Sequence, residues 1–290
     1  MKIRKTVVTL AGPSQRRLPL QTLVSREGEP RSVLALLLDE ACQAGAEEVC
    51  LVVSPGDREP YSQVLGDHQG RVHFQEQAEP RGYGHAVYQA RDFVGDEPFL
   101  HMVGDHLYVG RRANGCASQL VAVAAAENCT VSAVQPTREG LLTRFGAVGG
   151  QKVAGKAGLY RVDTILEKPT PTEAEQKIIV PGLRAGHYLC FFGMHVLTPA
   201  VMEILAELDR DGPSRPLSLS AALARLPERE RYLACEMADQ RYDLGTRYGL
   251  FVAQFALAMS GKDREEVLSQ LLEVLALRES GAPAEAEPGR

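Results

Sequence analysis

The sequence contains no tryptophan and no run of apolar residues long enough to cross a membrane. A membrane-spanning helix needs about 20 consecutive apolar residues, and no stretch of this chain approaches that length. Residues 1–5 are basic, but the apolar run at 6–10 is too short for the apolar part of a signal peptide. We therefore expect a cytoplasmic protein with no membrane partner.

The chain also has no strong excess of one charge. It contains 32 Lys and Arg residues and 37 Asp and Glu residues, which gives a formal net charge of −5. A mildly acidic chain has no general attraction for nucleic acid or for an anionic membrane, so any phosphate it binds needs a local site. None of the six cysteines belongs to a CxxC pair. We expect them to be buried free thiols, as in a reducing cytosol, and not metal ligands or disulfides.

The composition itself is that of a globular protein, with 44% apolar and 24% charged residues over 290 positions. Residues 7–12 have the pattern of a buried strand that runs into a glycine turn, residues 32–44 that of a helix, and residues 48–53 that of a second buried strand. Such a strand–helix–strand unit implies a parallel sheet. Further strands are predicted at 72–75, 99–103, 130–134, 145–148, 158–166 and 188–196, and further helices at 60–65, 85–93, 116–127, 199–208, 217–226, 248–259 and 264–277.

This order of elements predicts an α/β fold with a doubly wound, Rossmann-like mixed sheet and a C-terminal helical segment. We expect one nucleotide-using domain over residues 1–262, with a first half at about 1–135 and a second-substrate half at about 136–262. The C-terminal helix would then occupy 263–279. Residues 280–290 are rich in Ala, Pro, Glu and Gly, which predicts a disordered tail.

The turn after the first strand is the first candidate for chemistry. It contains Ala11, Gly12 and Arg16, and Arg26 follows in the same irregular stretch. A glycine turn at the carboxyl end of the first parallel strand is where doubly wound sheets bind phosphate, and guanidinium groups grip phosphate oxygens. The alternative interpretation is a plain surface loop.

A second candidate is the segment that contains Gln77, Gly82, Gly84 and His85. Two glycines ahead of a helix let backbone approach a planar ligand closely, and a glutamine offers both a donor and an acceptor to the edge of a base. The alternative for His85 is a residue at the start of a helix that makes local hydrogen bonds.

Carboxylates follow several predicted strands. Asp105 comes directly after the strand at 99–103, and a carboxylate at that edge of an α/β sheet can bind Mg²⁺ beside a triphosphate. Glu167 and Lys168 also stand at a strand end, where they could hold a sugar hydroxyl and a phosphate. Asp243 could be a second metal ligand. The alternatives are a solvated turn for Asp105, a surface ion pair for Glu167 and Lys168, and a helix N-cap for Asp243.

The order and spacing of these segments resemble the sugar-nucleotide pyrophosphorylase family, most closely its bacterial UTP–glucose-1-phosphate uridylyltransferases. Residues 12–19 read GPSQRRLP where that family has GxGTRxxP, and Arg26 falls where a lysine is expected. The other matches are the Gln77 to Ala86 segment, Asp105, Phe145-Gly146, Glu167-Lys168-Pro169 and Asp243-Leu244-Gly245.

The resemblance implies that a sugar 1-phosphate attacks the α-phosphorus of a nucleoside triphosphate, UTP before others, and releases pyrophosphate with Mg²⁺ as cofactor. It assigns the metal to Asp105 and Asp243, and the triphosphate and pyrophosphate to Arg16 and Arg26. Ala11, Gly12, Gln77, Gly82, Gly84 and His85 would bind the nucleotide, and Gly146, Glu167 and Lys168 the sugar phosphate. We also expect a homo-oligomer that binds no nucleic acid.

Three positions depart from the family pattern, namely Ser14, Gln15 and Arg26, and Pro13 stiffens the same loop. Two alternatives therefore remain. One is the same fold acting on dTTP or on another sugar phosphate. The other is a catalytically impaired relative that binds a nucleotide sugar as a regulator.

Overall fold

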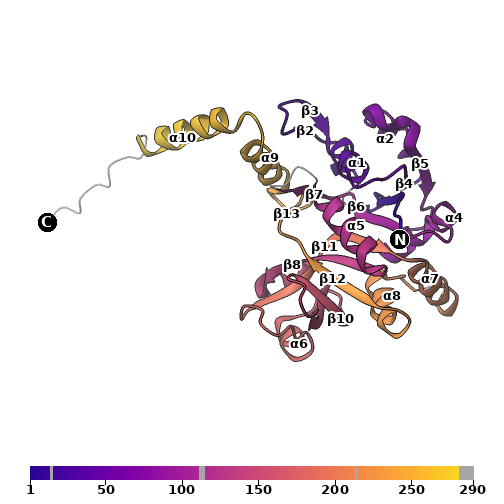
Figure 1. Cartoon of the computed structure of the whole chain (residues 1–290). Coiled ribbons are helices and arrows are strands. Elements are labelled where there is room, and N and C mark those ends of the chain that lie inside the picture. Colours follow the sequence, from indigo (N-terminus) through magenta and orange to yellow (C-terminus); the bar gives the residue numbers. More distant parts are fainter. Residues whose placement is uncertain (14–15, 111–114, 213–214, 281–290) are drawn as a thin grey trace.

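Nine strands form one mixed sheet in the computed structural model, which describes residues 1–13, 16–110, 115–212 and 215–280 (Figure 1). The order across the sheet is β5-β4-β1-β6-β11-β8-β12-β10-β9. The strands are β1 (Lys5–Thr9), β4 (Glu48–Val53), β5 (Val72–Glu76), β6 (Phe99–Val103), β8 (Thr130–Arg138), β9 (Ala147–Lys152), β10 (Leu159–Leu166), β11 (His187–Leu197) and β12 (Tyr232–Glu236). Two small ribbons stand beside this sheet, β2 (Thr22–Val24) with β3 (Pro30–Ser32) and β7 (His106–Val109) with β13 (Gln240–Asp243).

Helices cover both faces of the sheet (Figure 1). The α-helices are α1 (Val33–Gln43), α2 (Arg58–Ser62), α3 (Tyr83–Gln89), α4 (Arg91–Val94), α5 (Gly115–Glu127), α6 (Pro171–Lys177), α7 (Pro199–Asp211), α8 (Leu219–Arg225), α9 (Gly249–Ser260) and α10 (Arg264–Ser280). Short 3-10 turns lie at η1 (Leu18–Leu20), η2 (Gly66–Arg71), η3 (Glu139–Arg144) and η4 (Leu226–Glu228). Val8 of β1 packs into the core with α1 and α5, whereas its neighbour Val7 packs with α3, α7 and α8. This alternation confirms the predicted doubly wound arrangement, since successive strand residues point to opposite faces.

Strand β11 joins the two sequence halves into one sheet. It comes late in the chain, yet it lies antiparallel between β6 and β8, with His195 opposite both His101 and Ser132. The pairs β1–β4, β1–β6, β4–β5 and β8–β12 are parallel, so the sheet is mixed as predicted. Residues before and after position 135 therefore share one hydrogen-bonded sheet.

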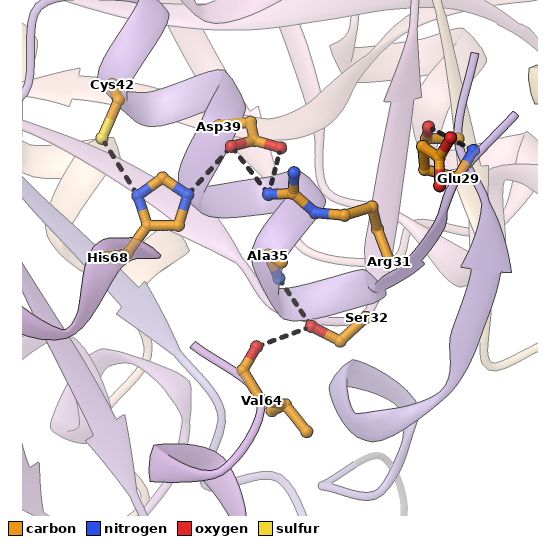
Figure 2. Close-up of polar contacts among 9 residues, drawn as sticks. Glu29, Arg31, Ser32, Ala35, Asp39, Cys42, Val64 and His68 are labelled. Carbon is orange, nitrogen blue, oxygen red and sulfur yellow. Dashed lines mark hydrogen bonds and ion pairs between the residues drawn. The ribbon is translucent and has the colours of Figure 1, made fainter. Parts of the chain in front are cut away.

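The start of α1 is fixed by a side-chain cap (Figure 2). The hydroxyl of Ser32 accepts a hydrogen bond from Ala35 N at 3.0 Å and donates one to the Val64 carbonyl at 2.9 Å. Further along the same helix, Asp39 accepts from Arg31 and lies 2.9 Å from His68 Nε2. These contacts attach α1, the helix that follows the β2–β3 ribbon, to residues 64–71.

Removing this cap tests the account of α1. Ser32→Ala loses one helix cap and one hydrogen bond to Val64, so the free energy of unfolding should fall by about 1–2 kcal/mol. Urea titration followed by circular dichroism measures the change. Ser62→Ala is the matched control, because the Ser62 hydroxyl hydrogen-bonds, among the described residues, to the Arg58 carbonyl one turn back in α2. An equal loss in both variants would contradict the assigned cap.

A row of polar side chains crosses the core beneath α3, α7 and α8. The Tyr83 hydroxyl lies 2.5 Å from His101 Nε2, and the His101 ring stacks on His195 with ring centres 6.0 Å apart. His195 Nδ1 in turn lies 2.6 Å from the Ser132 hydroxyl, which also contacts the Tyr232 hydroxyl at 2.6 Å. Burial lowers the pKa of His101 to about 4 and that of His195 to about 3, so both are neutral at pH 7.

Several sequence predictions need correction. A helix was expected to start near Asp243, but the chain there is the strand β13, and α9 begins at Gly249 with Tyr248 as its N-cap. The N-cap interpretation of Asp243 is therefore wrong. Strand β12 and both ribbons were missed. The C-terminal helix extends through Ser280, and the rest of the predicted tail, like Ser14 and Gln15 of the first loop, lies outside the described residues.

The structure also bears on the expectations for the cysteines and for membrane-spanning helices. All six cysteines are free thiols in the structure, and five of them are buried as expected, whereas Cys42 is half-buried. No helix within the described residues is long and apolar enough to span a membrane.

Candidate active site

A cleft of about 590 Å³ opens at the carboxyl ends of β1, β5, β6 and β10. Most of the residues singled out in the sequence line it: Ala11, Gly12, Gln77, Gly82, Asp105, Glu167, Lys168 and Asp243. The parallel strands β1, β5 and β6 end at the same edge of the sheet, so Ala11, Gln77 and Asp105 meet there. Glu167 and Lys168 follow β10, which runs antiparallel to those strands, and Asp243 belongs to the β7–β13 ribbon. The lining also includes Phe145 of the Phe145-Gly146 match, and three residues that were not predicted: Tyr83, His106 and Arg144.

The β7–β13 ribbon brings the two candidate metal ligands together. Asp105 lies between β6 and β7, and Asp243 is the last residue of β13, where it pairs with His106. The Asp105 carbonyl accepts a hydrogen bond from Leu244 N at 2.9 Å, so each aspartate sits beside the other strand of the ribbon. The Tyr108 hydroxyl anchors this ribbon to β11 by donating to the Gly193 carbonyl at 2.9 Å.

The Asp105 carboxyl group is held in its ionised form. Burial alone would raise its pKa, but the hydrogen bond and charge of His106, 2.8 Å away, together with Arg241 lower the pKa below its usual value. Asp243 accepts a hydrogen bond from Gly245 N at 2.9 Å, which orients its carboxylate. The Asp105 carboxylate is therefore a negatively charged oxygen donor, and Asp243 adds a second carboxyl group held in a fixed direction.

This donor pair fits Mg²⁺ better than a metal that needs a complete protein cage. No group of three or more His, Cys, Asp or Glu side chains in the described part of the chain could hold a metal ion. Magnesium is often bound through one or two carboxylates, with substrate phosphates and water completing its octahedral shell. Asp105 and Asp243 meet that description.

Gln77 belongs to the cleft lining, and its side-chain amide already makes contacts within the protein. Its side-chain nitrogen donates to the Gly82 carbonyl at 3.2 Å and lies 3.0 Å from His85 Nδ1. In the His85 tautomer that leaves Nδ1 unprotonated, both amide hydrogens are used within the protein, and the Gln77 oxygen is then the acceptor for a ligand. His85 itself is buried, touches Gln89 on its other side, and is outside the cleft lining. The structure makes it a residue that positions Gln77, as its local-hydrogen-bond interpretation expected.

Backbone of residues 217–219 lies close to both glycines of this segment. A Cβ on Gly84 would lie 2.7 Å from the backbone of Ser218 and Leu219, and one on Gly82 would lie 2.7 Å from the Leu217 carbonyl oxygen. Gly84 N also donates to that carbonyl at 2.9 Å. Protein backbone, and not a planar ligand, therefore makes the close approach at Gly84, while Gly82 still borders the cleft.

Glu167 and Lys168 belong to the cleft lining, and Gly146 lies against Glu167. A Cβ on Gly146 would meet the Phe191 ring at 2.7 Å and the Glu167 carboxylate at 3.1 Å, so this glycine makes room for both side chains. Gly146 itself is outside the cleft lining, whereas Glu167 and Lys168 belong to it. Lys168 has a backbone φ of +48°, which is uncommon for a residue other than glycine. Such strain is found at functional sites more often than elsewhere.

The two predicted catalytic arginines do not reach this cleft. Arg16 lies in the first loop, but its guanidinium pairs with Asp57 at 3.5 Å. Arg26 donates to the Gly110 carbonyl at 2.6 Å and borders a separate groove against α9 and α10. Both guanidinium groups are thus engaged outside the cleft lining, and their role toward the triphosphate stays a prediction.

Arg241 is the residue that the sequence analysis missed. Its guanidinium lies 3.6 Å from the centre of the Phe145 ring and interacts electrostatically with both Asp105 and Asp243. Its Nη1 atom is buried with no hydrogen-bond partner in the described structure. Arg241 and Asp243 are two positions apart on β13, so their side chains lie on the same face of that strand. The sequence would have indicated this arrangement only if residues 240–243 had been recognised as a strand.

The family model described as nucleotidyl transferase matches residues 16–259, which is most of the chain. The chain belongs to the nucleotidyl transferase family. The family resemblance of the sequence is thereby confirmed, and the protein is a nucleotidyltransferase.

Relatives and solved structures agree with this assignment. A UTP–glucose-1-phosphate uridylyltransferase of Streptococcus pneumoniae serotype 4 is 28% identical over 303 residues, covering 93% of this chain and 95% of the relative. One from Streptococcus pyogenes is 28% identical over 315 residues, covering 99% of each. A UDP-glucose pyrophosphorylase solved with UDP-glucose has a TM-score of 0.71 at 22% identity and covers 88% of this chain and 98% of that one. The UTP-bound enzyme of Acinetobacter baumannii reaches a TM-score of 0.73 at 22% identity, covering 94% and 100%. The predicted fold is confirmed.

Proposed function

We propose that this nucleotidyltransferase joins UTP to glucose 1-phosphate and forms UDP-glucose and pyrophosphate, with Mg²⁺, in the cytoplasm. The relatives of S. pneumoniae and S. pyogenes are named for that reaction. The observation that carries the proposal is the meeting of Asp105 and Asp243 at the β7–β13 ribbon, in the same cleft lining as Gln77 and Lys168.

The charges of the cleft support a metal-dependent reaction. Its lining contains three carboxylates, Asp105, Glu167 and Asp243, against the two cations Arg144 and Lys168. A nucleoside triphosphate would add further negative charge to this surface, so binding needs additional positive charge. Mg²⁺ held by Asp105 and Asp243 would supply that charge and stabilise the phosphates during transfer.

The remaining steps use residues of this chain. The Gln77 oxygen is an acceptor that suits the N3–H group of uracil, a group that cytosine and adenine lack at the corresponding edge. Lys168 would hold the sugar phosphate, and Glu167 would accept hydrogen bonds from sugar hydroxyls. An oxygen of the sugar 1-phosphate then attacks the α-phosphorus in line with the departing pyrophosphate. No covalent intermediate with the protein is required, since positioning and charge neutralisation suffice.

Thymine carries the same N3–H group, so the alternative of dTTP stays open beside UTP. Initial rates of pyrophosphate release with UTP, dTTP, CTP and ATP, each with glucose 1-phosphate, separate these possibilities. We expect UTP to give the highest kcat/KM and CTP and ATP to be poor. A preference for CTP or ATP would contradict the role given to Gln77.

A catalytically impaired nucleotide-sugar binder is the second candidate, and one observation favours it. Arg16 and Arg26 are engaged with Asp57 and Gly110 and are not in the cleft lining. Calorimetry with UDP-glucose, combined with the rate assay, distinguishes the two functions. Tight binding of UDP-glucose without any pyrophosphate release would favour the binder.

Replacing Lys168 tests the assignment of the sugar half. Lys168→Ala should raise the Kd for glucose 1-phosphate by on the order of tenfold or more, because a charge-assisted contact is lost, while the Kd for UTP changes less than twofold. Titrating each substrate by calorimetry measures both constants. Lys177→Ala, which removes an exposed lysine of α6 outside the cleft, is the charge-matched control.

Lys168→Gly separates binding from backbone strain. Glycine accepts a φ of +48° without penalty, so this variant should be more stable than Lys168→Ala by about 1 kcal/mol, yet bind glucose 1-phosphate equally weakly. If UTP affinity fell and glucose 1-phosphate affinity did not, Lys168 would belong to the nucleotide half of the site.

A further inference from the structure

A thiol, an imidazole and a carboxylate meet on the surface of the protein, outside the cleft lining. Of the six cysteines, all of which the structure describes, Cys42 is the one that is only half-buried. It lies on α1 one turn after Asp39, so the two side chains project from the same face of the helix. His68 of the turn η2 lies between them (Figure 2). These are the residue types that act together in nucleophilic catalysis.

The hydrogen bonds of His68 determine which ring nitrogen can act as a base. Its Nε2 atom lies 2.9 Å from Asp39 Oδ1, and both Asp39 oxygens also accept from Arg31, at 3.1 Å and 2.9 Å. A carboxylate can only accept, so the hydrogen of the neutral imidazole lies on Nε2 and Nδ1 carries none. Cys42 Sγ lies 3.7 Å from that Nδ1 atom. The thiol can therefore donate its proton to His68.

The surroundings of Cys42 keep its thiol protonated until it reacts. Burial raises the pKa of Cys42, Arg71 lowers it, and Asp39 raises it. A protonated thiol is a weak nucleophile unless a neighbouring base takes the proton as the new bond forms. His68 has that position, and Asp39 would stabilise the imidazolium that results. The two contacts from Arg31 hold the Asp39 carboxylate in place for this task.

We propose that Cys42 is a reactive thiol that exchanges with low-molecular-weight disulfides bearing carboxylates, with His68 as its general base and Asp39 orienting the base. The Cys42 sulfur attacks one sulfur of the disulfide R–S–S–R, so that a new S–S bond forms to Cys42 and the old S–S bond breaks. The Cys42 sulfur is oxidised, and the departing sulfur is reduced to R–SH. The proton passes from Cys42 to His68 Nδ1 and then to the departing thiolate, which regenerates the base.

Two features of the site favour this class of electrophile. Exchange with a disulfide takes one proton from the nucleophile and returns one to the leaving group, and a neutral imidazole can do both. Among the charges that act on the Cys42 sulfur, the positive charge of Arg71 has a larger effect than the negative charge of Asp39. The carboxylates of the disulfide would therefore be attracted to the site. The inference does not depend on which substrates the cleft binds.

Exchange with three disulfides tests the substrate class. The full chain would be incubated with the anionic dithiodipropionate, the neutral hydroxyethyl disulfide and the cationic cystamine, and mass spectrometry would give the rate and the modified residue. We expect one added group, at Cys42, with dithiodipropionate the fastest reagent. Arg71→Gln should remove that preference. Cys42→Ser is the control and should gain no group, because its remaining cysteines are buried. Modification of another cysteine first, or fastest reaction with cystamine, would overturn the proposal.

Replacing His68 separates a general base from a structural contact. His68→Gln should lower the exchange rate at pH 7 on the order of tenfold to a hundredfold. Its rate should then rise about tenfold per pH unit, as for an isolated thiol, while the natural rate depends less on pH. If His68 only held α1 against η2, the substitution would expose Cys42 and raise the rate.

Asp39→Asn should also lower the rate, because the imidazole loses the carboxylate that orients it. His73→Gln, which replaces a histidine that is 53% exposed, is the matched control and should keep the natural rate and pH profile. Circular dichroism checks that each variant is folded. An unchanged or raised exchange rate at pH 7 in His68→Gln or in Asp39→Asn would contradict the assigned roles.

Discussion

Asp105→Asn should lower the rate of pyrophosphate release by a hundredfold or more, about the effect of removing one preorganised charge-stabilising contact from an active site. The change keeps the size of the side chain but removes one of the two negative charges that would hold Mg²⁺. The phosphates in the cleft would then face Glu167 and Asp243 with weaker neutralisation. Steady-state rates over a range of Mg²⁺ concentrations measure the loss, and part of it should be recovered at high Mg²⁺ because metal affinity is what falls.

Asp163→Asn serves as the control, because Asp163 is an exposed carboxylate on β10 that does not line the cleft. Its rate should stay within a factor of two of the natural protein. A correctly folded Asp105→Asn protein with an intact rate at low Mg²⁺ would remove Asp105 from the metal site and leave the ribbon as a structural element only.

The stability of the fold should fall steeply when the pH drops from 6.5 to 4, because of the two buried histidines. Burial depresses the folded-state pKa of His101 to about 4 and that of His195 to about 3, whereas unfolded histidine titrates near its ordinary value. Between these values the unfolded chain binds more protons than the folded one, so stability is complete above about pH 6.5 and declines as the pH falls. Each histidine should contribute a loss of about 3 kcal/mol by pH 4.

Urea titrations at pH 7, 6, 5 and 4 measure this decline. His195→Gln keeps a polar contact with Ser132 but cannot take up a proton in this range, so its stability should depend less on pH even if it is less stable at pH 7. His101→Leu should flatten the profile in the same way. His73→Gln, whose side chain is 53% exposed, is the control and should retain the natural slope. Unchanged slopes in both core variants would show that the acid sensitivity arises from other groups.

The residues at strand ends could be predicted from the sequence, and the physical reason is simple. Gln77 and Asp105 each follow a strand of the parallel set, and parallel strands bring the residues that follow them to one edge of the sheet. The local pattern does not show that Asp243 joins them, and only the family resemblance predicted it, because its position depends on β13, a strand of four residues that pairs outside the main sheet. A segment that short carries too little periodicity to distinguish a strand from a helix start.

The residues of the first loop could not be placed for a different reason. A guanidinium near a glycine turn suits phosphate binding, but its direction depends on partners elsewhere in the chain. Asp57 holds Arg16, and the Gly110 carbonyl holds Arg26, and neither contact follows from local sequence. In the same way, Gly84 fits the pattern of a ligand-binding glycine, although the residue that needs the space is Leu219. The local sequence also does not predict that β11 lies between β6 and β8, because this placement depends on strands far away in the chain.

The most direct test of the central claim is pyrophosphate release by the purified protein with UTP, glucose 1-phosphate and Mg²⁺, measured with and without each component. The account predicts turnover that requires all three, that stops when Mg²⁺ is chelated, and that yields UDP-glucose and pyrophosphate in equal amounts. Release of pyrophosphate without glucose 1-phosphate, or no release from a folded protein with any nucleoside triphosphate and any hexose 1-phosphate, would contradict it.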